Sequence, residues 1–271
     1  MIEAANEAAR LPGTAGAREV GAAQLLVAVR RGAPRLAALP AEVAPQTLAE
    51  AYAIQHEVLR QLGARIGGWK VSMFDARNGV CAPIAANTLL PSPALLTTTG
   101  IPTRNTNRLG VESEVAFLMG SDLPPRAGAA YALDEVLAAV ASAHPVIEIV
   151  VSRYIHADAV SRLDNVADAF INEALIIGPA CTDWRALALP TLPLQVEVDG
   201  AVVHSARGGH PLGDPLLPLA WLANHLSSLG GGLRRGDYVT TGSCDGIRYI
   251  QAGQRVRTQF TGLGNVEVSF Q

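Results

Sequence analysis

The sequence has few cysteines, no excess of basic residues and no long apolar run. Its three cysteines are an odd number without CxxC spacing, which argues against a disulfide framework and a thiolate metal site. A net charge of −3, with scattered basic residues, offers no footprint for nucleic acid or an anionic membrane. The apolar runs fall short of the roughly 20 residues that cross a bilayer, and the first residues lack a signal-peptide core. We therefore expect a cytoplasmic protein with a small-molecule partner, no nucleic acid and no membrane.

Several common catalytic motifs are also missing. The sequence contains no GxSxG turn, no Walker loop and no dinucleotide fingerprint, which disfavours a serine hydrolase and a nucleotide-dependent enzyme. Its six histidines show no paired metal-ligand spacing, and we expect them at the surface or at helix caps. With 271 residues, 49% apolar and 17% charged, the chain fits one globular domain of about 250 residues with a short arm.

Helical patterns come first along the chain. Residues 1–18 show no periodic apolar pattern and are expected to form a loose tail. Helical spacing over 18–31 and 47–62, the second opened by a capping box, then predicts two helices. We assign residues 1–66 to a tail and N-terminal helical arm, and residues 67–271 to a catalytic β-rich domain.

Short β-like runs dominate the rest of the sequence. The expected strands lie at 69–74, 111–119, 146–151, 174–177, 194–198, 202–205, 238–241, 256–260 and 266–270. Asp199-Gly200 predicts a tight hairpin, and helices are expected at 133–143 and after the cap Asp214, with Pro215 as the first helical residue. Because strands outnumber helices and do not alternate with them, we predict an α+β fold with a mixed β-roll body.

The most informative local pattern is a pair of acidic residues in one expected strand. A strand places residues i and i+2 on one face, so Glu112 and Glu114 point the same way and share that face with apolar residues. Two poorly hydrated carboxylates repel unless a proton or cation lies between them, and oxygen ligands favour Mg²⁺ or Mn²⁺ over Zn²⁺. The alternative is an edge strand with two solvated glutamates.

A third acid lies in a run that is otherwise apolar. Glu148 is flanked by Val146, Ile147 and Ile149, a pattern typical of a strand covered on both faces. A buried carboxylate needs a partner, and three convergent carboxylates predict an octahedral site open to a substrate. The alternative is an inward salt bridge from Glu148 to Arg153.

Two further segments are candidates for substrate contact. Lys70 follows a glycine pair at the start of a strand, where it could bind a carboxylate or move a proton; the latter role requires that burial lower its pKa. A solvated surface lysine is the alternative. The polar segment 240–246 carries Thr241 and Ser243 and could hold an anion, or it forms only a tight turn.

Six segments in this order resemble the fumarylacetoacetate hydrolase superfamily, most of all its 2-keto-4-pentenoate hydratase and 4-oxalocrotonate decarboxylase branch. They are GGWKV at 67–71, GVESEVAFLM with SDLPP at 110–125, HPVIEIVVSRY at 144–154, GDPLLPLAWLANHL at 213–226, GDYVTTGS at 236–243 and the closing GLGNVEVSF. The resemblance covers about residues 45–271. It implies the family's mixed β-roll body, a homo-oligomer, a divalent metal on Glu112, Glu114 and Glu148, and Lys70 as the active-site lysine.

The chain also departs from the family pattern. Val151 stands where the family usually has an acid, Ala169 stands where it usually has an amide, and the segment 79–83 lacks acids often found there. Loss of polar groups around a complete metal triad suggests altered substrate or altered chemistry. Arg153 and Asp168 are candidates for supporting the carboxylate cage and contributing to substrate binding.

Four functions follow in order of preference. The resemblance implies a hydratase that adds water to a 2-hydroxydienoate or 2-oxo-enoate in aromatic-compound catabolism, with the metal as Lewis acid and template. A 4-oxalocrotonate-type decarboxylase comes second. A C–C hydrolase of an acylpyruvate comes third, because no His–acid pair that would activate water is evident. A non-catalytic 2-oxo acid binding or assembly subunit is the alternative of a different class, and retention of Lys70 with three acids argues against it.

Overall fold

The computed structural model describes residues 15–98 and 109–271. Within these ranges the helices are α1 (Ala17–Arg30), α2 (Leu48–Leu62), α3 (Leu133–Ala138), α4 (Arg162–Ala167) and α5 (Leu216–Ser228). The strands are β1 (Ile66–Met73), β2 (Gly79–Ala85), β3 (Leu89–Pro91), β4 (Ala94–Leu96), β5 (Leu109–Met119), β6 (Val140–Val150), β7 (Asn172–Ile177), β8 (Pro193–Val198), β9 (Ala201–Arg207), β10 (Tyr238–Thr240), β11 (Arg248–Ile250), β12 (Arg255–Phe260) and β13 (Gly264–Phe270). The predicted loose tail lies largely outside the described residues. Among the described helices, none combines the length and apolarity needed to cross a membrane.

The strands form two sheets. The larger has the order β2-β1-β10-β5-β6-β7-β3, with β11 also paired to β5, and it mixes parallel and antiparallel neighbours. The smaller has the order β4-β13-β12-β8-β9. Strands β12 and β13 pack against β6, so the antiparallel pair β5–β6 lies between the rest of the larger sheet and the smaller one. The α+β class and the mixed β body predicted from the sequence are confirmed.

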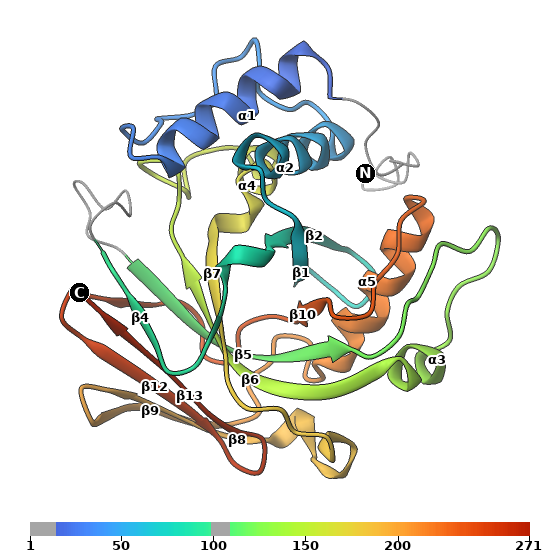
Figure 1. Cartoon of the computed structure of the whole chain (residues 1–271), viewed down its shortest axis with the longest axis vertical. Coiled ribbons are helices and arrows are strands. Elements are labelled where there is room, and N and C mark those ends of the chain that lie inside the picture. Colours follow the sequence, from blue (N-terminus) through green and yellow to red (C-terminus); the bar gives the residue numbers. More distant parts are fainter. Residues whose placement is uncertain (1–14, 99–108) are drawn as a thin grey trace.

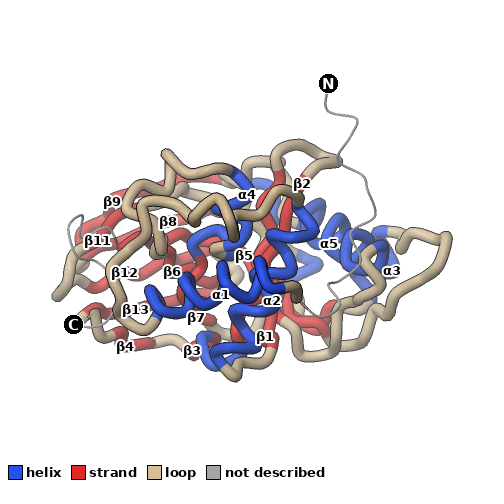
Figure 2. Tube along the Cα trace, turned by 90° about the horizontal axis from the view of Figure 1, so that it is seen from above, coloured by secondary structure: helices blue, strands red, loops and turns tan. Residues whose placement is uncertain are grey.

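The helices of the N-terminal arm cover one side of the larger sheet. Figure 1 shows α1 and α2 on the side away from the smaller sheet, with α4 beneath α2. Seen from above in Figure 2, α5 and α3 lie at one end of the molecule and β8, β9 and β12 at the other. Thr47 caps α2 by accepting a hydrogen bond from the Glu50 backbone N–H, and Gly63 ends that helix in the left-handed conformation, as its sequence predicts. The domain division at residue 66 stays a prediction.

One helix prediction was too long. The sequence pattern predicts a helix over 133–143, but α3 ends at Ala138 and β6 begins at Val140. Residues 140–143 pair with the far end of β5, where Ala143 lies opposite Phe117. Pairing along nearly the whole of β5 thus overrides local helix preference. Helix α5 also begins slightly later than predicted, at Leu216, since Pro215 is its N-cap.

The predicted hairpin is confirmed. Asp199 and Gly200 connect β8 to β9 with φ values of 52° and 82°. Two successive positive φ angles are what a tight type I′ turn requires. The turn therefore joins β8 to β9 as the sequence predicts, and the register of this pair shifts between Val196 and Glu197.

A partly buried histidine, His225, joins the arm to α5 and makes stability depend on pH. His225 stacks on Trp221 and lies within hydrogen-bond distance of the Tyr52 hydroxyl, at 3.1 Å from its Nε2. Burial lowers the pKa of His225 from 6.5 to about 4, so the unfolded chain binds the extra proton more readily than the folded chain between these values. The stabilising contribution of neutral His225 is complete above pH 6.5 and is lost as the pH falls toward 4.

We therefore expect His225→Gln to flatten the acid dependence of stability. Between pH 7.5 and pH 5 the variant should lose about 2 kcal/mol less unfolding free energy than the wild type. Urea unfolding of both proteins at the two pH values measures this difference. Equal losses in the two proteins would show that His225 titrates normally in the folded state.

Candidate metal centre and active site

Three carboxylates meet where β5 and β6 pair. Glu112 and Glu114 project from one face of β5 because side chains alternate along a strand. Glu148 lies directly across from Glu112 in the antiparallel register, so its side chain joins the same face. One oxygen from each of the three lies within 4.8 Å of the others. The structure thus brings the predicted triad together, with Glu114 and Glu148 buried and Glu112 partly exposed.

The two carboxylate oxygens of Glu148 have different surroundings. Its Oε1 accepts hydrogen bonds from Lys70 Nζ and from Asn172 Nδ2, both at 2.7 Å. Its Oε2 is buried and has no hydrogen-bond partner among the described residues. A buried carboxylate oxygen without a donor is costly, and a cation resolves that cost. Glu148 is therefore preorganised to present one oxygen to a metal ion.

Glu114 is likewise held through one of its oxygens. Its Oε2 accepts a hydrogen bond from the backbone N–H of Gly242 at 2.9 Å and another from the Thr240 hydroxyl. Both donors belong to β10 and the turn after it, since β10 pairs with β5. Oxygen-only donors in this number suit a hard divalent cation such as Mg²⁺ or Mn²⁺, with water or substrate completing the shell.

The proximity of the three carboxylates raises the pKa of two of them. Burial and the nearby charge of Glu148 raise the pKa of Glu112 to about 7, although Lys70 acts in the opposite direction. Burial, Glu148 and Glu112 raise the pKa of Glu114 well above its usual range. The three carboxylates are therefore not all ionised near pH 7 without a cation.

We expect the affinity for a divalent cation to increase with pH. Below pH 7 the cation must displace the proton of Glu112, whereas above pH 7 it meets an ionised carboxylate. Mn²⁺ binding should therefore weaken about tenfold from pH 7.5 to pH 6. Titrations with Mn²⁺ followed by electron paramagnetic resonance at both pH values measure this change. An affinity that is the same at both would contradict the pKa assignment.

Lys70 lies beside the triad and is charged there. Its side chain is buried, and Nζ contacts both Glu148 Oε1 and the Phe170 carbonyl oxygen, the latter at 3.0 Å. Burial alone would lower the pKa of Lys70, but the charges of Glu148, Glu112 and Glu114 outweigh it and raise that pKa. The expectation that burial lowers the Lys70 pKa is therefore wrong for the metal-free protein. The alternative interpretation of Lys70 as a solvated surface lysine is also wrong, because its side chain is buried.

Lys70, Glu112 and Glu114 line a cavity of about 290 Å³. Thr241 and Ser243 also line it, but the Thr241 hydroxyl donates to the Val115 carbonyl oxygen and is turned away from a ligand. The remaining lining residues are mostly apolar: Val71, Ser72, Met73, Phe170, Ile171, His210, Pro211, Leu212, Gly242 and Ile247. The substrate-binding role of Thr241 and Ser243 stays a prediction.

A histidine that the sequence placed at the surface lies in this cavity. His210 is buried, its Nδ1 accepts from the Leu212 backbone N–H at 3.2 Å, and its Nε2 donates to the Thr241 carbonyl oxygen at 2.8 Å. Burial lowers its pKa, so the ring is neutral. His144 in β6 is buried too. Surface placement is therefore wrong for both histidines, because each has backbone partners that only the tertiary structure supplies.

Arg153 and Asp168 do not line the cavity. Their fully buried side chains form an ion pair, and Arg153 also binds Glu173 at 2.8 Å. The alternative salt bridge from Glu148 to Arg153 is not formed, since Lys70 occupies that place. The pair contacts the segment that runs beneath Lys70, which agrees with a supporting position. A direct part in substrate binding stays a prediction.

The sequence analysis missed Asn172, Thr240 and the backbone of Gly242. Asn172 occupies the first position of β7, next to a register irregularity between Ile149 and Val150 of β6. Such a bulge redirects side chains, and no local pattern in the sequence announces it. The hydroxyl-rich segment after residue 238 did signal polar contacts, but not their direction toward Glu114.

The carboxylate triad on β5 and β6, with a lysine beside it, is the arrangement of a metal-dependent enzyme site. The family model of the fumarylacetoacetate (FAA) hydrolase C-terminal domain matches residues 82–271. The chain belongs to this family, and the resemblance to the fumarylacetoacetate hydrolase superfamily is confirmed.

Named relatives fall in the predicted branch. The chain is 28% identical over 261 residues to a 2-keto-4-pentenoate hydratase of Paraburkholderia xenovorans, covering 94% of this chain and 95% of the relative. It is 28% identical over 237 residues to a 4-oxalocrotonate decarboxylase of Pseudomonas putida, covering 83% and 86%. Among solved structures, 4-oxalocrotonate decarboxylase from Pseudomonas putida G7, complexed with magnesium and adipate, superposes with a TM-score of 0.82 at 22% identity. That match covers 94% of this chain and 97% of the other.

Proposed function

We propose that this protein is a metal-dependent hydratase that adds water to a 2-hydroxydienoate or 2-oxo-enoate of the 2-keto-4-pentenoate type, in aromatic-compound catabolism. The observation that carries the proposal is the convergence of Glu112, Glu114 and Glu148, with Lys70 paired to Glu148. Lys70, Glu112 and Glu114 of this group also line the cavity. The curated hydratase relative that spans 94% of this chain supports the same reaction.

The residues present fit a divalent cation, Mg²⁺ or Mn²⁺. Glu148 Oε2 is buried and receives no hydrogen bond from the residues that the structure describes, and Glu112 and Glu114 add two more carboxylates. A cation held by these three residues supplies Lewis acidity toward the carboxylate and 2-oxygen of the substrate. A structural neighbour in the decarboxylase group contains magnesium, which supports the choice of a hard ion.

Lys70 is the residue we assign to proton movement or to pairing with the substrate carboxylate. Two of the three N–H donors of its ammonium are used by Glu148 Oε1 and by the Phe170 carbonyl oxygen. The third donor remains for a ligand. Lys70 also lines the cavity, and burial keeps water away from its proton. Ser243 is assigned to the carboxylate end of the substrate, and Arg153 with Asp168 to supporting the cage. Thr241 was the other candidate for the carboxylate, but its hydroxyl proton is already donated to the Val115 carbonyl oxygen.

The apolar walls of the cavity favour hydration over decarboxylation. Phe170, Ile171, Leu212 and Ile247 line it, and such surfaces match the apolar tail of a monocarboxylate. A decarboxylase of the 4-oxalocrotonate type is the second candidate, favoured by the likeness to the Pseudomonas putida G7 enzyme. A C–C hydrolase is third, because both ring nitrogens of His210 have backbone partners and the ring is not free to activate water.

We further propose that the protein is a homo-oligomer, as the family resemblance implies, and that it lies in the cytoplasm, as expected from the sequence pattern. Light scattering coupled to size exclusion at the assay concentration measures the mass of the assembly. A monomeric mass would contradict the proposed assembly without affecting the proposed reaction.

The reaction is tested with two substrates in parallel. The purified protein is mixed with Mg²⁺ or Mn²⁺ and freshly generated 2-hydroxypenta-2,4-dienoate or its dicarboxylate relative, with EDTA as control. Loss of dienol absorbance without CO₂ release, abolished by EDTA, is the expected result. CO₂ release from the dicarboxylate would assign the second function, and absence of turnover on both would overturn the proposal.

A further inference from the structure

A strained turn lies next to Lys70 and is followed at once by Asn172, which contacts Glu148. Ala169, Phe170 and Ile171 have φ values of 52°, 47° and 58°, three successive left-handed residues of which none is glycine. Residues with a side chain rarely adopt this conformation, and β-branched isoleucine does so least. Backbone in this state persists only where surrounding contacts determine it, and such turns gather at functional sites.

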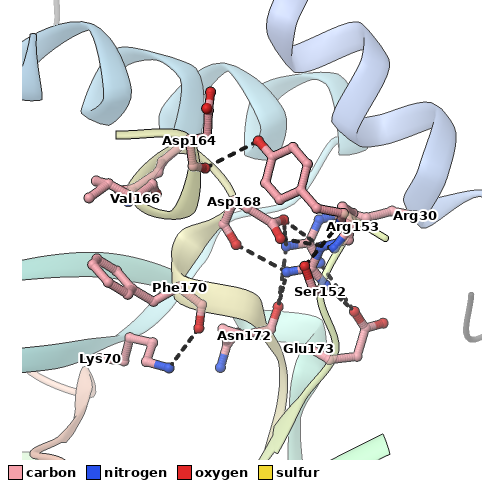
Figure 3. A network of polar contacts seen from close by, with 12 residues as sticks. Arg30, Lys70, Ser152, Arg153, Asp164, Val166, Asp168, Phe170, Asn172 and Glu173 are labelled. Atoms are coloured by element: carbon pink, nitrogen blue, oxygen red, sulfur yellow. Dashed lines mark hydrogen bonds and ion pairs between the residues drawn. The ribbon is translucent and has the colours of Figure 1, made fainter. Parts of the chain in front are cut away.

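The turn delivers two polar groups to the site. The Phe170 carbonyl oxygen accepts a hydrogen bond from Lys70 Nζ at 3.0 Å, as Figure 3 shows. Immediately after the turn, Asn172 Nδ2 donates to Glu148 Oε1 at 2.7 Å. Asn172 thereby donates to the same oxygen as Lys70, whereas Glu148 Oε2 receives no hydrogen bond within residues 15–98 and 109–271.

A fully buried guanidinium spans the turn from one end to the other. Arg153 donates through one nitrogen to the carbonyl oxygens of Asp168 at 3.0 Å and Asn172 at 3.1 Å, the residues on either side of the turn (Figure 3). Its Nε pairs with the Asp168 carboxylate, which also accepts the Arg153 backbone N–H at 3.0 Å. A planar group with donors in fixed directions suits this task better than an ammonium.

The N-terminal arm contributes to the same support. Arg30 of α1 donates to the Asn172 carbonyl oxygen at 3.2 Å and pairs with Glu173 at 3.4 Å. The Ile171 carbonyl oxygen accepts from the Val151 backbone N–H at 2.8 Å. Val151, which stands where the family usually has an acid, is therefore a backbone anchor of the turn and its side chain is part of the core.

We propose that Asn172 is a positioning residue of the metal site, and that Arg153 acts through the turn Ala169–Ile171 to hold it there. Asn172 fixes the rotation of the Glu148 carboxylate so that Oε2 is presented to the cation. Groups that orient metal ligands in this way commonly change metal affinity about 10-fold to 100-fold when they are removed. The inference rests on the proposed metal site and is independent of which substrate the enzyme takes.

The test compares Mn²⁺ affinities, measured by electron paramagnetic resonance without substrate. Asn172→Ala removes the amide, Arg153→Lys keeps the charge but removes the planar fork, and Asn224→Ala is the matched control. Asn224 lies on α5, outside the site, and its side chain donates to the Tyr131 carbonyl oxygen. Truncating Asn224 therefore also removes a side-chain amide and its hydrogen bond. We expect Asn172→Ala to weaken Mn²⁺ binding at least tenfold, Arg153→Lys to weaken it in the same direction, and Asn224→Ala to leave it within twofold. Thermal unfolding of each variant confirms that it is folded.

The outcomes separate this inference from the proposed function. If the wild type binds Mn²⁺ and Asn172→Ala binds it with an affinity within twofold of the wild type, only the positioning role is overturned. An equal loss in Asn172→Ala and Asn224→Ala would also overturn it, because the effect would then be general destabilisation. A wild-type protein that binds no Mn²⁺ would overturn the proposed metal site and this inference with it.

Discussion

Replacing Glu114 by glutamine is expected to abolish both metal binding and turnover. Oε2 of Glu114 accepts hydrogen bonds from the Gly242 N–H and the Thr240 hydroxyl. The amide oxygen of glutamine takes over these two contacts, which turns its NH₂ group toward the cation. An NH₂ group is a donor and cannot serve as a ligand. Because changes outside a ligand set already cost about 10-fold to 100-fold, we expect Mn²⁺ affinity to fall by more than about 100-fold.

Calorimetric or resonance titration with Mn²⁺ measures this loss, and the dienol assay measures turnover. Glu42→Gln is the matched control, since it removes the same charge from an exposed position outside the site. We expect the control to bind and react as the wild type does. A Glu114→Gln enzyme that kept full activity would contradict the metal hypothesis.

Replacing Lys70 by methionine is expected to separate metal binding from catalysis. The change removes the ammonium from Glu148 and from the cavity but keeps a side chain of similar length. Without this positive charge the triad attracts a cation at least as strongly, so Mn²⁺ binding should persist. Turnover should fall by about 10²-fold to 10⁴-fold, the usual contribution of a positioned proton-transfer group. Persistence of turnover within tenfold would remove Lys70 from the reaction.

The sequence itself sharpens the Lys70 experiment. Lys70 is the only lysine among the 21 Lys and Arg residues of the chain. The chain thus has a compact side-chain ammonium only at position 70, and its other basic residues of this class are arginines with a bulkier guanidinium. We expect Lys70→Arg to be nearly as inactive as Lys70→Met, because its fork does not fit between Glu148 and the Phe170 carbonyl oxygen. Activity close to wild type in Lys70→Arg would mean that charge alone suffices.

Local patterns were enough to find the ligands of the proposed metal site. Alternation along a strand places Glu112 and Glu114 on one face, and an apolar run marks Glu148 as buried. These signals are strong because a buried carboxylate is costly wherever it occurs. Only the structure shows that Glu148 lies directly across from Glu112 in the paired strands. The sequence led us to expect that the three carboxylates converge, but not this register.

The supporting residues could not be found in this way. Asn172 contacts Glu148 only because three left-handed residues and a bulge redirect the chain before β7. Ala169 and Ile171 give no sequence signal for that conformation, which glycine or asparagine ordinarily marks. The overlong helix prediction at 133–143 has a related cause, since pairing of β6 with β5 decides the conformation of those residues. In both places, contacts between distant segments outweigh local preference.

Addition of water is the central step of the proposed reaction, and it is measured most directly with labelled water. The protein, Mg²⁺ and 2-hydroxypenta-2,4-dienoate are mixed in H₂¹⁸O. The product is then returned to H₂¹⁶O, so that its ketone loses exchanged label, and it is chemically reduced and analysed by mass spectrometry. We expect one ¹⁸O atom in the new hydroxyl group, with all incorporation lost in EDTA and in Glu114→Gln. A product that carries no ¹⁸O in that group, or incorporation that is indifferent to EDTA, would contradict the account.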